Sequence, residues 1–240
     1  MISKVKNDLF DYPNRYIMQI KDGFKFSLDS LLLAEFTKLR QRDKLILDMC
    51  TGNAPVPLIL SLKTDAKIIG FELQKDIAEL ASESVLINDL DKQIKVINDD
   101  VKNIGEFFKP NTFDVITCNP PYFKINDVGC KNKNDYLTLA RHEIAIDLET
   151  IFKLVNRFLK DNGVFYMVHR AERLDEIIIL ANKYKLNVKE IQFISTKKNN
   201  NPNTILVKCV KNSKWGVKIK KEICVDNLST YQHLFEGSSK

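Results

Sequence analysis

The chain has 240 residues, 44% of them hydrophobic, and a formal net charge of +6 with a pI near 8.9. No apolar stretch approaches the roughly 20 residues of a membrane span, and residues 1–10 lack the apolar core of a signal peptide. We therefore expect a cytoplasmic protein that forms one domain over residues 1–240. The mild excess of positive charge favours a polyanionic partner but does not establish one.

The cysteines are odd in number and scattered along the chain. They are Cys50, Cys118, Cys130, Cys209 and Cys224. None forms a Cys-x-x-Cys pair or stands near a histidine at metal-ligand spacing. This pattern predicts reduced, mostly buried thiols and no metal site.

Apolar runs predict strands that alternate with helices along the chain. We expect strands at 44–50, 67–72, 93–98, 113–118 and 164–169, and helices at 53–63, 74–88, 147–160 and 171–184. Asn53 is the expected cap of the first helix, with two prolines in its first turn. Residues 186–195 and 204–210 are expected to form a final antiparallel pair. The pattern predicts an α/β fold with a mostly parallel, seven-stranded sheet.

In such a sheet, ligands bind beyond the carboxyl ends of the strands. The first strand ends in Asp48-Met-Cys-Thr-Gly52-Asn-Ala54-Pro55, which resembles the S-adenosylmethionine loop Asp-x-Gly-x-Gly-x-Gly. Gly52 would let the cofactor approach the backbone, and Asp48 would order the loop or reach the cofactor amine through water. Cys50 and Ala54 stand where glycines are common, so an ordinary strand-to-helix turn is the alternative.

The next two strands also end in acidic residues. Glu72 stands about twenty residues after the loop, where an acid takes the two ribose hydroxyls of a nucleoside cofactor. The alternative for Glu72 is a solvated residue at a strand end. Asp100 is placed to accept the adenine amine; Asp99 is its rival, and one of the two is expected to be only a turn residue.

The fourth strand runs directly into Asn119-Pro120-Pro121-Tyr122. The Asn119 amide oxygen and the Pro120 carbonyl can each accept one hydrogen of a planar amine, and the prolines fix the backbone that aims them. Tyr122 offers a flat face on which a base can stack. This arrangement suits methyl transfer to a planar amino nitrogen. The alternative is a strand that ends in a Pro-Pro turn with a buried tyrosine.

Taken together, these motifs resemble the bacterial tRNA(Val) (adenine-N6)-methyltransferases, which modify adenosine 37 beside the anticodon. The resemblance includes the segments 24–34, 140–143 and 168–174 and covers nearly the whole chain. It implies a Rossmann-like class I methyltransferase fold that ends in an antiparallel hairpin, with S-adenosyl-L-methionine as cofactor and tRNA as partner. It also implies that residues 1–43 line the cofactor site, with Asp29 and Asn119 against the cofactor.

The resemblance further implies substrate contacts by Tyr122, Arg141 and His142. Lys124 flanks the Asn-Pro-Pro-Tyr loop and could meet RNA phosphates. The alternatives are plainer. Residues 24–34 could form only a capped amphipathic helix, and residues 141–143 only a surface cluster. Lys124 and the many C-terminal lysines could be solvated rather than bound to RNA. We expect a monomer or a weak dimer.

Four other functions fit parts of the pattern. A release-factor glutamine methyltransferase shares the Asn-Pro-Pro-Tyr loop but carries a sizeable helical domain ahead of the fold, for which Asp48 comes too early. A DNA adenine methyltransferase adds a target-recognition domain, and guanine-N2 rRNA enzymes more often carry Phe at the position of Tyr122. A catalytically silent RNA-binding protein is favoured only by Ala54 and Pro55.

Overall fold

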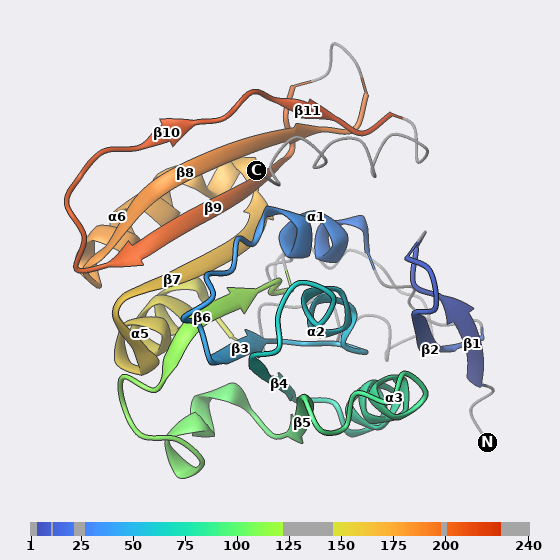
Figure 1. The fold of residues 1–240 in the computed structure, drawn as a ribbon. Helices are drawn as coiled ribbons and strands as arrows, with labels where there is room; N and C mark the ends of the chain where they lie inside the picture. The colour runs from blue at the N-terminus through green and yellow to red at the C-terminus, as the bar shows by residue number, and fades with distance from the viewer. Residues whose placement is uncertain (1–3, 11, 22–26, 122–145, 198–200, 227–240) are drawn as a thin grey trace, which may run out of the picture.

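A computed structural model of the chain describes residues 4–10, 12–21, 27–121, 146–197 and 201–226 (Figure 1). The main sheet has the strand order β10-β8-β9-β7-β6-β3-β4-β5, with β11 also paired to β8. Five strands run parallel: β3 (Leu45–Met49), β4 (Lys67–Glu72), β5 (Ile94–Asn98), β6 (Phe113–Cys118) and β7 (Leu159–Arg170). β8 (Leu186–Ser195) and β9 (Thr204–Lys211) form the antiparallel hairpin, and β9 also pairs antiparallel with β7. All seven predicted strands are therefore present.

Helices cover both faces of this sheet (Figure 1). One face packs against α1 (Leu28–Phe36), α2 (Pro55–Leu60) and α3 (Lys75–Leu86). The other packs against η1 (Val101–Glu106), α5 (Leu148–Phe158), η3 (Ala171–Arg173) and α6 (Leu174–Lys183). Neighbouring strand residues alternate between the two cores, as Ile46 and Leu47 do on β3.

A small second sheet, β1 (Lys4–Asp8) paired with β2 (Tyr16–Ile20), packs against α3 and was not expected. Asn88 accepts a hydrogen bond from the Tyr16 N–H, and Ser84 accepts one from the Met18 N–H, both at 2.9 Å. Most side chains of β1 are exposed, so its sequence lacks the apolar alternation that marks a strand.

The expected cap of α2 is wrong. The helix begins at Pro55, and its cap is Ala54 in the left-handed region at φ 71°. The Asn53 side chain donates instead to the Met18 carbonyl at 2.9 Å, which ties β2 to the loop after β3. A local cap rule could not foresee this partner, because it lies 35 residues away in the chain.

The sheet is also longer at two points than the sequence predicted. β7 begins at Leu159 rather than at 164, and its register against β6 shifts between Phe113 and Val115. Two short strands, β10 (Lys218–Ile219) and β11 (Ile223–Cys224), add to the outer side of β8 and run parallel to it. Each has two residues, too few to leave a periodic signal.

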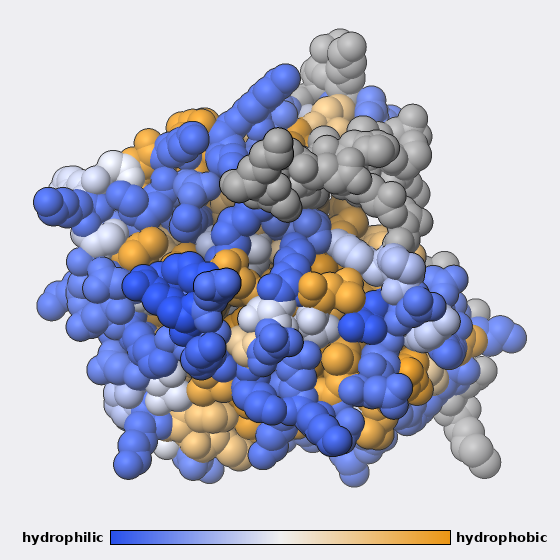
Figure 2. Space-filling view, viewed as in Figure 1, coloured by the Kyte–Doolittle hydropathy of each residue, from blue (hydrophilic) through white to orange (hydrophobic). Residues whose placement is uncertain are grey.

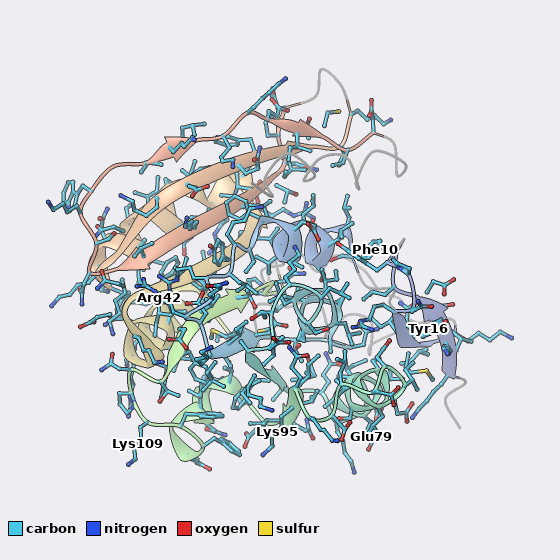
Figure 3. The ribbon with its side chains drawn as sticks, in the orientation of Figure 1. Phe10, Tyr16, Arg42, Glu79, Lys95 and Lys109 are labelled. Atoms are coloured by element: carbon cyan, nitrogen blue, oxygen red, sulfur yellow. The ribbon has the colours of Figure 1, made fainter. Side chains whose placement is uncertain are left out.

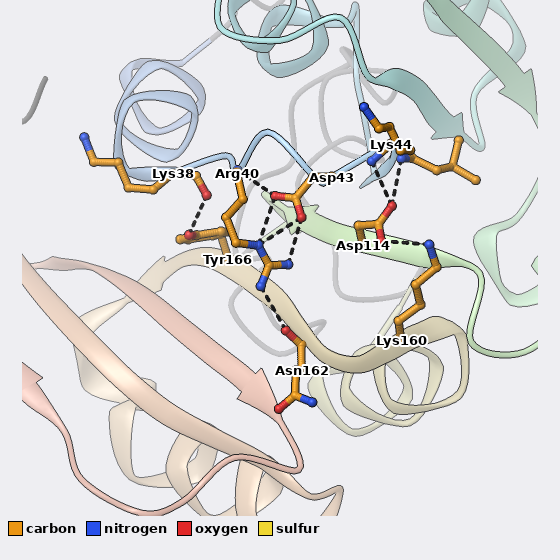
Figure 4. Close-up of polar contacts among 9 residues, drawn as sticks. Lys38, Arg40, Asp43, Lys44, Asp114, Lys160, Asn162 and Tyr166 are labelled. Carbon is orange, nitrogen blue, oxygen red and sulfur yellow. Dashed lines mark hydrogen bonds and ion pairs between the residues drawn. The ribbon is translucent and has the colours of Figure 1, made fainter.

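The segment between α1 and β3 is tied to the strands beneath it (Figure 4). Asp114, on β6, accepts from the backbone N–H groups of Lys44 at 2.9 Å and Leu45 at 3.0 Å. The Lys160 ammonium lies 2.7 Å from the same carboxylate. Tyr166, on β7, donates to the Lys38 carbonyl at 3.0 Å. These contacts fix where α1 lies over the sheet.

The four cysteines within the described residues, Cys50, Cys118, Cys209 and Cys224, are free thiols. Cys118 and Cys209 are buried, and burial raises the pKa of both. Cys130 lies outside the described residues.

Candidate active site

The loop between β3 and α2 carries three left-handed residues in alternation. Cys50, Gly52 and Ala54 have φ values of 57°, 58° and 71°. The glycines of the Asp-x-Gly-x-Gly-x-Gly pattern would stand at these same three positions, and glycine adopts this conformation without steric cost. A residue with a side chain destabilises the folded state by roughly 1–2 kcal/mol in this conformation. The loop therefore keeps the glycine-type backbone even where the sequence departs from the pattern.

Asp48 ties this loop to the neighbouring strand. Its two carboxylate oxygens accept hydrogen bonds from the hydroxyls of Thr51 and Thr117, each at 2.6 Å. The residue is only 2% exposed. Thr51 follows β3 and Thr117 lies on β6, so the carboxylate connects the two carboxyl ends. Of the two roles expected for Asp48, these contacts favour ordering of the loop.

Glu72 lies against the same loop. Its carboxylate accepts from the Gly52 N–H and from the Gln74 N–H, both at 2.9 Å. Burial raises the pKa of Glu72, and these two hydrogen bonds oppose the rise. The structure thus brings together two residues that the sequence assigned to the cofactor. Each carboxylate oxygen has a second lone pair with which to meet a ribose hydroxyl.

The space beside Gly52 is open. Apart from Gly52 itself and its two chain neighbours, no heavy atom of the described residues lies within 4 Å of the position that a Cβ would take there. Open space next to a left-handed glycine, whose N–H donates to the Glu72 carboxylate, leaves room for the ribose end of a nucleoside cofactor. The residues present therefore fit S-adenosylmethionine.

Three residues that shape this loop were missed by the sequence analysis: Thr51, Gly70 and Thr117. A Cβ at Gly70, on β4, would lie 2.9 Å from the Thr51 hydroxyl oxygen. Gly70 thus leaves room for the side chain that holds Asp48. The signal for Thr117 was present, since it is a polar residue inside an otherwise apolar strand.

Asp99 and Asp100 follow β5 and both serve the turn there. Asp100 accepts from the Lys102 N–H at 2.9 Å and pairs with the Lys102 ammonium at 2.9 Å. Asp99 accepts from the Asp100 N–H at 2.7 Å and from the Asn103 side chain at 2.9 Å. The role of Asp100 toward an adenine stays a prediction.

Asn119 and Pro120 follow β6, beside the carboxyl end of β3. The Asn119 side-chain nitrogen donates to the hydroxyl of Ser30 at 3.0 Å. Ser30 lies in the first turn of α1, next to Asp29. The structure therefore brings part of the N-terminal segment to the Asn-Pro-Pro loop. Tyr122, Lys124, Arg141 and His142 lie outside the described residues.

A comparison of the sequence with protein families agrees with this architecture. A family model described as a methyltransferase domain matches residues 41–224, most of the chain. The chain belongs to the methyltransferase-domain family. Methyltransferases with this fold take their methyl group from S-adenosylmethionine, and the open space beside Gly52 agrees with that cofactor.

Individual relatives are more distant. One from Bacteroides thetaiotaomicron, named tRNA1(Val) (adenine(37)-N6)-methyltransferase, is 27% identical over 215 residues, which cover 88% of this chain and 87% of the relative. A predicted O-methyltransferase from Agrobacterium tumefaciens superposes with a TM-score of 0.65 at 18% identity, covering 83% of this chain and 88% of that one. Geranyl diphosphate C-methyltransferase from Streptomyces coelicolor, solved with S-adenosyl-L-homocysteine, has a TM-score of 0.56 at 10% identity, with 76% of each chain covered. The two structures support the fold alone.

None of the helices in the described part of the chain is long and apolar enough to cross a membrane. Within the same residues, no three His, Cys, Asp or Glu side chains are grouped so that they could hold a metal ion.

Burial raises the pKa of Asp48 to about 7, against the lowering effect of the two threonine hydroxyls. An unfolded Asp ionises near pH 3.9, so between about pH 4 and 7 the folded protein binds more protons at this residue than the unfolded chain does. The free energy of unfolding therefore falls as pH rises through this window. We expect Asp48→Asn to remove that fall, which amounts to at most about 4 kcal/mol.

Urea unfolding of the parent and of Asp48→Asn at pH 5, 6, 7 and 8 measures this difference. Asp65→Asn, at an exposed position, is the matched control. A parent-to-variant difference in unfolding free energy that stays constant over this range would contradict the account.

Proposed function

We propose that this chain transfers the methyl group of S-adenosylmethionine to N6 of an adenosine in tRNA, with adenosine 37 of tRNA(Val) as the target. The observation that carries the proposal is the place of Asn119 and Pro120. They follow β6 directly beside the loop of Gly52 and Glu72, in a methyltransferase-family fold. The name of the Bacteroides relative supports the choice of substrate.

The Asn119 and Pro120 oxygens suit the weak nucleophile that this reaction must use. The lone pair of the adenine amine is delocalised into the ring. Two acceptors, the Asn119 amide oxygen and the Pro120 carbonyl, draw the amine hydrogens to one side and favour a pyramidal nitrogen. Positive charge develops on that nitrogen as the methyl group arrives, so both contacts strengthen in the transition state. The product ammonium is acidic enough to lose its proton to water, and the proposal requires no strong general base.

The cofactor supplies the electrophilic methyl group. Glu72 would hold the ribose, Gly52 would let the cofactor lie against the loop, and Asp48 would keep the loop in place. Asp100 would meet the adenine, and Asp29 and Asn119 would lie at the methionine end. Tyr122 would stack on the target base, which must leave its own stack first. An unpaired anticodon-loop base does this at low cost.

A silent RNA-binding protein is less well supported. That alternative rested on Ala54 and Pro55 in the cofactor loop. Ala54 has nevertheless taken the left-handed conformation of a glycine, and Gly52 remains tied to Glu72. The departure in sequence has therefore left the loop backbone intact.

Two unmodified tRNA(Val) transcripts test the choice of target. One carries adenosine at position 37 and the other carries guanosine there. We expect labelled methyl groups to enter only the first. Equal labelling of both would move the target to another nucleotide and contradict the proposal at that point.

A group of lysines offers a surface for the RNA backbone. We call Lys38, Lys208, Lys218 and Lys220 the β8 lysine cluster, because each interacts electrostatically with Glu190 on β8. The Lys208 ammonium lies 2.7 Å and the Lys220 ammonium 3.8 Å from its carboxylate. Burial lowers the pKa of Lys38, and Lys220 lowers it further. Positive charge thus exceeds negative charge here, and hydrophilic side chains predominate over this region (Figure 2).

We expect Lys218→Gln combined with Lys220→Gln to weaken tRNA binding. Each lost phosphate contact should also reduce the slope of log affinity against log salt by about 1. Lys95→Gln with Lys109→Gln is the matched control, since both residues lie on the side of β5 and η1, away from β8 (Figure 3). Fluorescence anisotropy with labelled tRNA measures both pairs. An equal loss of affinity in the two pairs would contradict a role for the cluster.

Residues 1–240 act as one domain, as a monomer or a weak dimer. A tRNA-modifying enzyme works where tRNA is found, so a cytoplasmic location follows from the proposed substrate.

A further inference from the structure

Two thiols meet at the edge of the sheet where the cofactor loop begins. Cys50 directly follows β3, and Cys118 is the last residue of β6, the parallel neighbour of β3 (Figure 1). Met49 and Cys118 are partners in the register of these two strands. A strand spacing of about 4.8 Å and one residue of rise put the Cα atoms of Cys50 and Cys118 roughly 6 Å apart. This separation lies within the range of disulfide-bonded cysteines.

The backbone at Cys50 places its side chain on the same face of the sheet as Cys118. Leu47 and Met49 belong to the core cluster that contains Cys118, so an extended residue at position 50 would point to the opposite face. Cys50 has a left-handed φ of 57° instead, and its side chain packs against that same cluster. Burial raises the pKa of Cys118, and a hydrogen bond with the Cys50 thiol raises it further. The two sulfurs are therefore neighbours.

The two thiols differ in their access to solvent. Cys118 is fully buried, whereas Cys50 is partly exposed. A small oxidant in solution therefore meets Cys50 first, and Cys118 lies behind it as a second thiol. An accessible thiol beside a resolving thiol is the arrangement that converts an oxidised cysteine into a disulfide.

We propose that Cys50 and Cys118 form a peroxide-sensitive dithiol whose oxidation lowers the affinity for the cofactor. The Cys50 sulfur attacks one oxygen of hydrogen peroxide: an S–O bond forms, the O–O bond breaks, and the leaving oxygen takes the thiol proton and departs as water. The Cys118 sulfur then attacks the sulfur of the Cys50 sulfenic acid. An S–S bond forms, the S–O bond breaks, and a second water leaves with the Cys118 proton. Two sulfurs are oxidised, and the two peroxide oxygens are reduced.

The disulfide distorts the cofactor loop. It brings the sulfurs to about 2.0 Å, well inside the contact distance of two thiols. β6 is a buried strand that is paired on both sides, so the loop moves rather than the strand. Gly52, whose N–H donates to Glu72, follows closely after Cys50. We therefore expect oxidation to weaken cofactor binding about 10-fold, whichever RNA the chain methylates.

Peptide mapping identifies the bond. The parent is treated with hydrogen peroxide, its remaining thiols are alkylated, and it is digested with trypsin without reduction. Cys50 and Cys118 then lie on the separate peptides 45–63 and 103–124, neither of which holds another cysteine. We expect these two peptides to be joined by a disulfide that dithiothreitol cleaves. A peroxide-treated parent without the linked pair would overturn the inference.

Calorimetric titration with S-adenosylhomocysteine measures the consequence. Peroxide should raise the dissociation constant of the parent about 10-fold, and dithiothreitol should reverse the change. In Cys50→Ala, peroxide should change the constant less than twofold relative to the same untreated variant. Cys224→Ala is the matched control, since it removes a partly exposed thiol on β11 and should respond as the parent does. An unchanged constant in a parent that carries the linked pair, or a parent-like response of Cys50→Ala, would overturn the inference.

Thermodynamic reciprocity gives a second reading of the same coupling. A disulfide that weakens cofactor binding must itself be opposed by the cofactor, by the same factor. Equilibration against mixtures of reduced and oxidised glutathione, with and without saturating S-adenosylhomocysteine, should give equilibrium constants for the disulfide that differ about 10-fold. Equal constants would contradict the coupling. A parent that binds no S-adenosylhomocysteine would instead be a failure of the cofactor assignment, and the linked peptides would still confirm or overturn the dithiol.

Discussion

Asn119→Ala should lower turnover by a factor of about 10²–10³, the usual effect of removing one aimed polar group from a transition state. The variant loses the amide oxygen that accepts a hydrogen of the target amine. Asn119 lies after β6 and is not a partner in the hydrogen bonds of Asp48, Gly52 and Glu72, so the cofactor loop keeps those bonds in the variant. We therefore expect cofactor binding within a few-fold of the parent. Single-turnover methyl transfer and cofactor titration measure the two effects separately.

The matched control is Asn182→Ala, at an exposed position on α6. It should leave both turnover and cofactor binding unchanged. Near-normal turnover by Asn119→Ala would remove the central residue from the mechanism. A loss of cofactor binding equal to the loss of turnover would instead place Asn119 mainly in the cofactor site.

Glu72→Ala should raise the dissociation constant of the cofactor about 100-fold. The variant loses the acceptor for the Gly52 N–H and, in our proposal, the acceptors for two ribose hydroxyls. Two hydrogen bonds from ribose hydroxyls to a charged carboxylate, at about 1.5 kcal/mol each, account for a change of this size. Calorimetric titration with S-adenosylhomocysteine, the product form of the cofactor, gives the value directly.

Glu79→Ala is the control, because Glu79 is exposed on α3 (Figure 3). Glu72→Gln adds a sharper comparison: it keeps the shape but turns one acceptor into a donor, so it should bind the cofactor more weakly than the parent. A parent-like dissociation constant for both Glu72 variants would contradict the assignment of the ribose to Glu72.

Much of the fold could be predicted because its strands are short, buried and apolar. β4 and β6 were predicted with the bounds that the structure has, since a strand buried on both faces appears in the sequence as one apolar run. The polar residues that end these runs then fall at one edge of the sheet. The sequence therefore predicts that Asp48, Glu72 and Asn119 lie near one another.

The remaining features depend on contacts between distant segments. Ser30 was part of a recognised motif, yet nothing in the sequence shows that its hydroxyl meets Asn119. Asn53 had the residue type of a helix cap but bonds to Met18 instead. The two short strands β10 and β11 exist because β8 offers a free edge, which is a property of the sheet and not of their own residues.

The cofactor loop shows how a departure from a pattern is tolerated. Cys50 and Ala54 stand at left-handed positions where the pattern has glycines. Each destabilises the folded state there by roughly 1–2 kcal/mol. Hydrogen bonds from Thr51 to Asp48 and from Gly52 to Glu72 hold the loop on either side of these residues. The sequence alone showed only the missing glycines, because the carboxylate that accepts from Gly52 comes from the neighbouring strand β4.

The central claim is that this chain methylates N6 of adenosine in tRNA. Its most direct test is methyl transfer from labelled S-adenosylmethionine to bulk unmodified tRNA, followed by digestion and nucleoside analysis, with Asn119→Ala as the inactive control. We predict that the label appears in N6-methyladenosine with the parent and is absent with the variant. Label in another nucleoside, or no label from a parent that binds the cofactor, would contradict the claim.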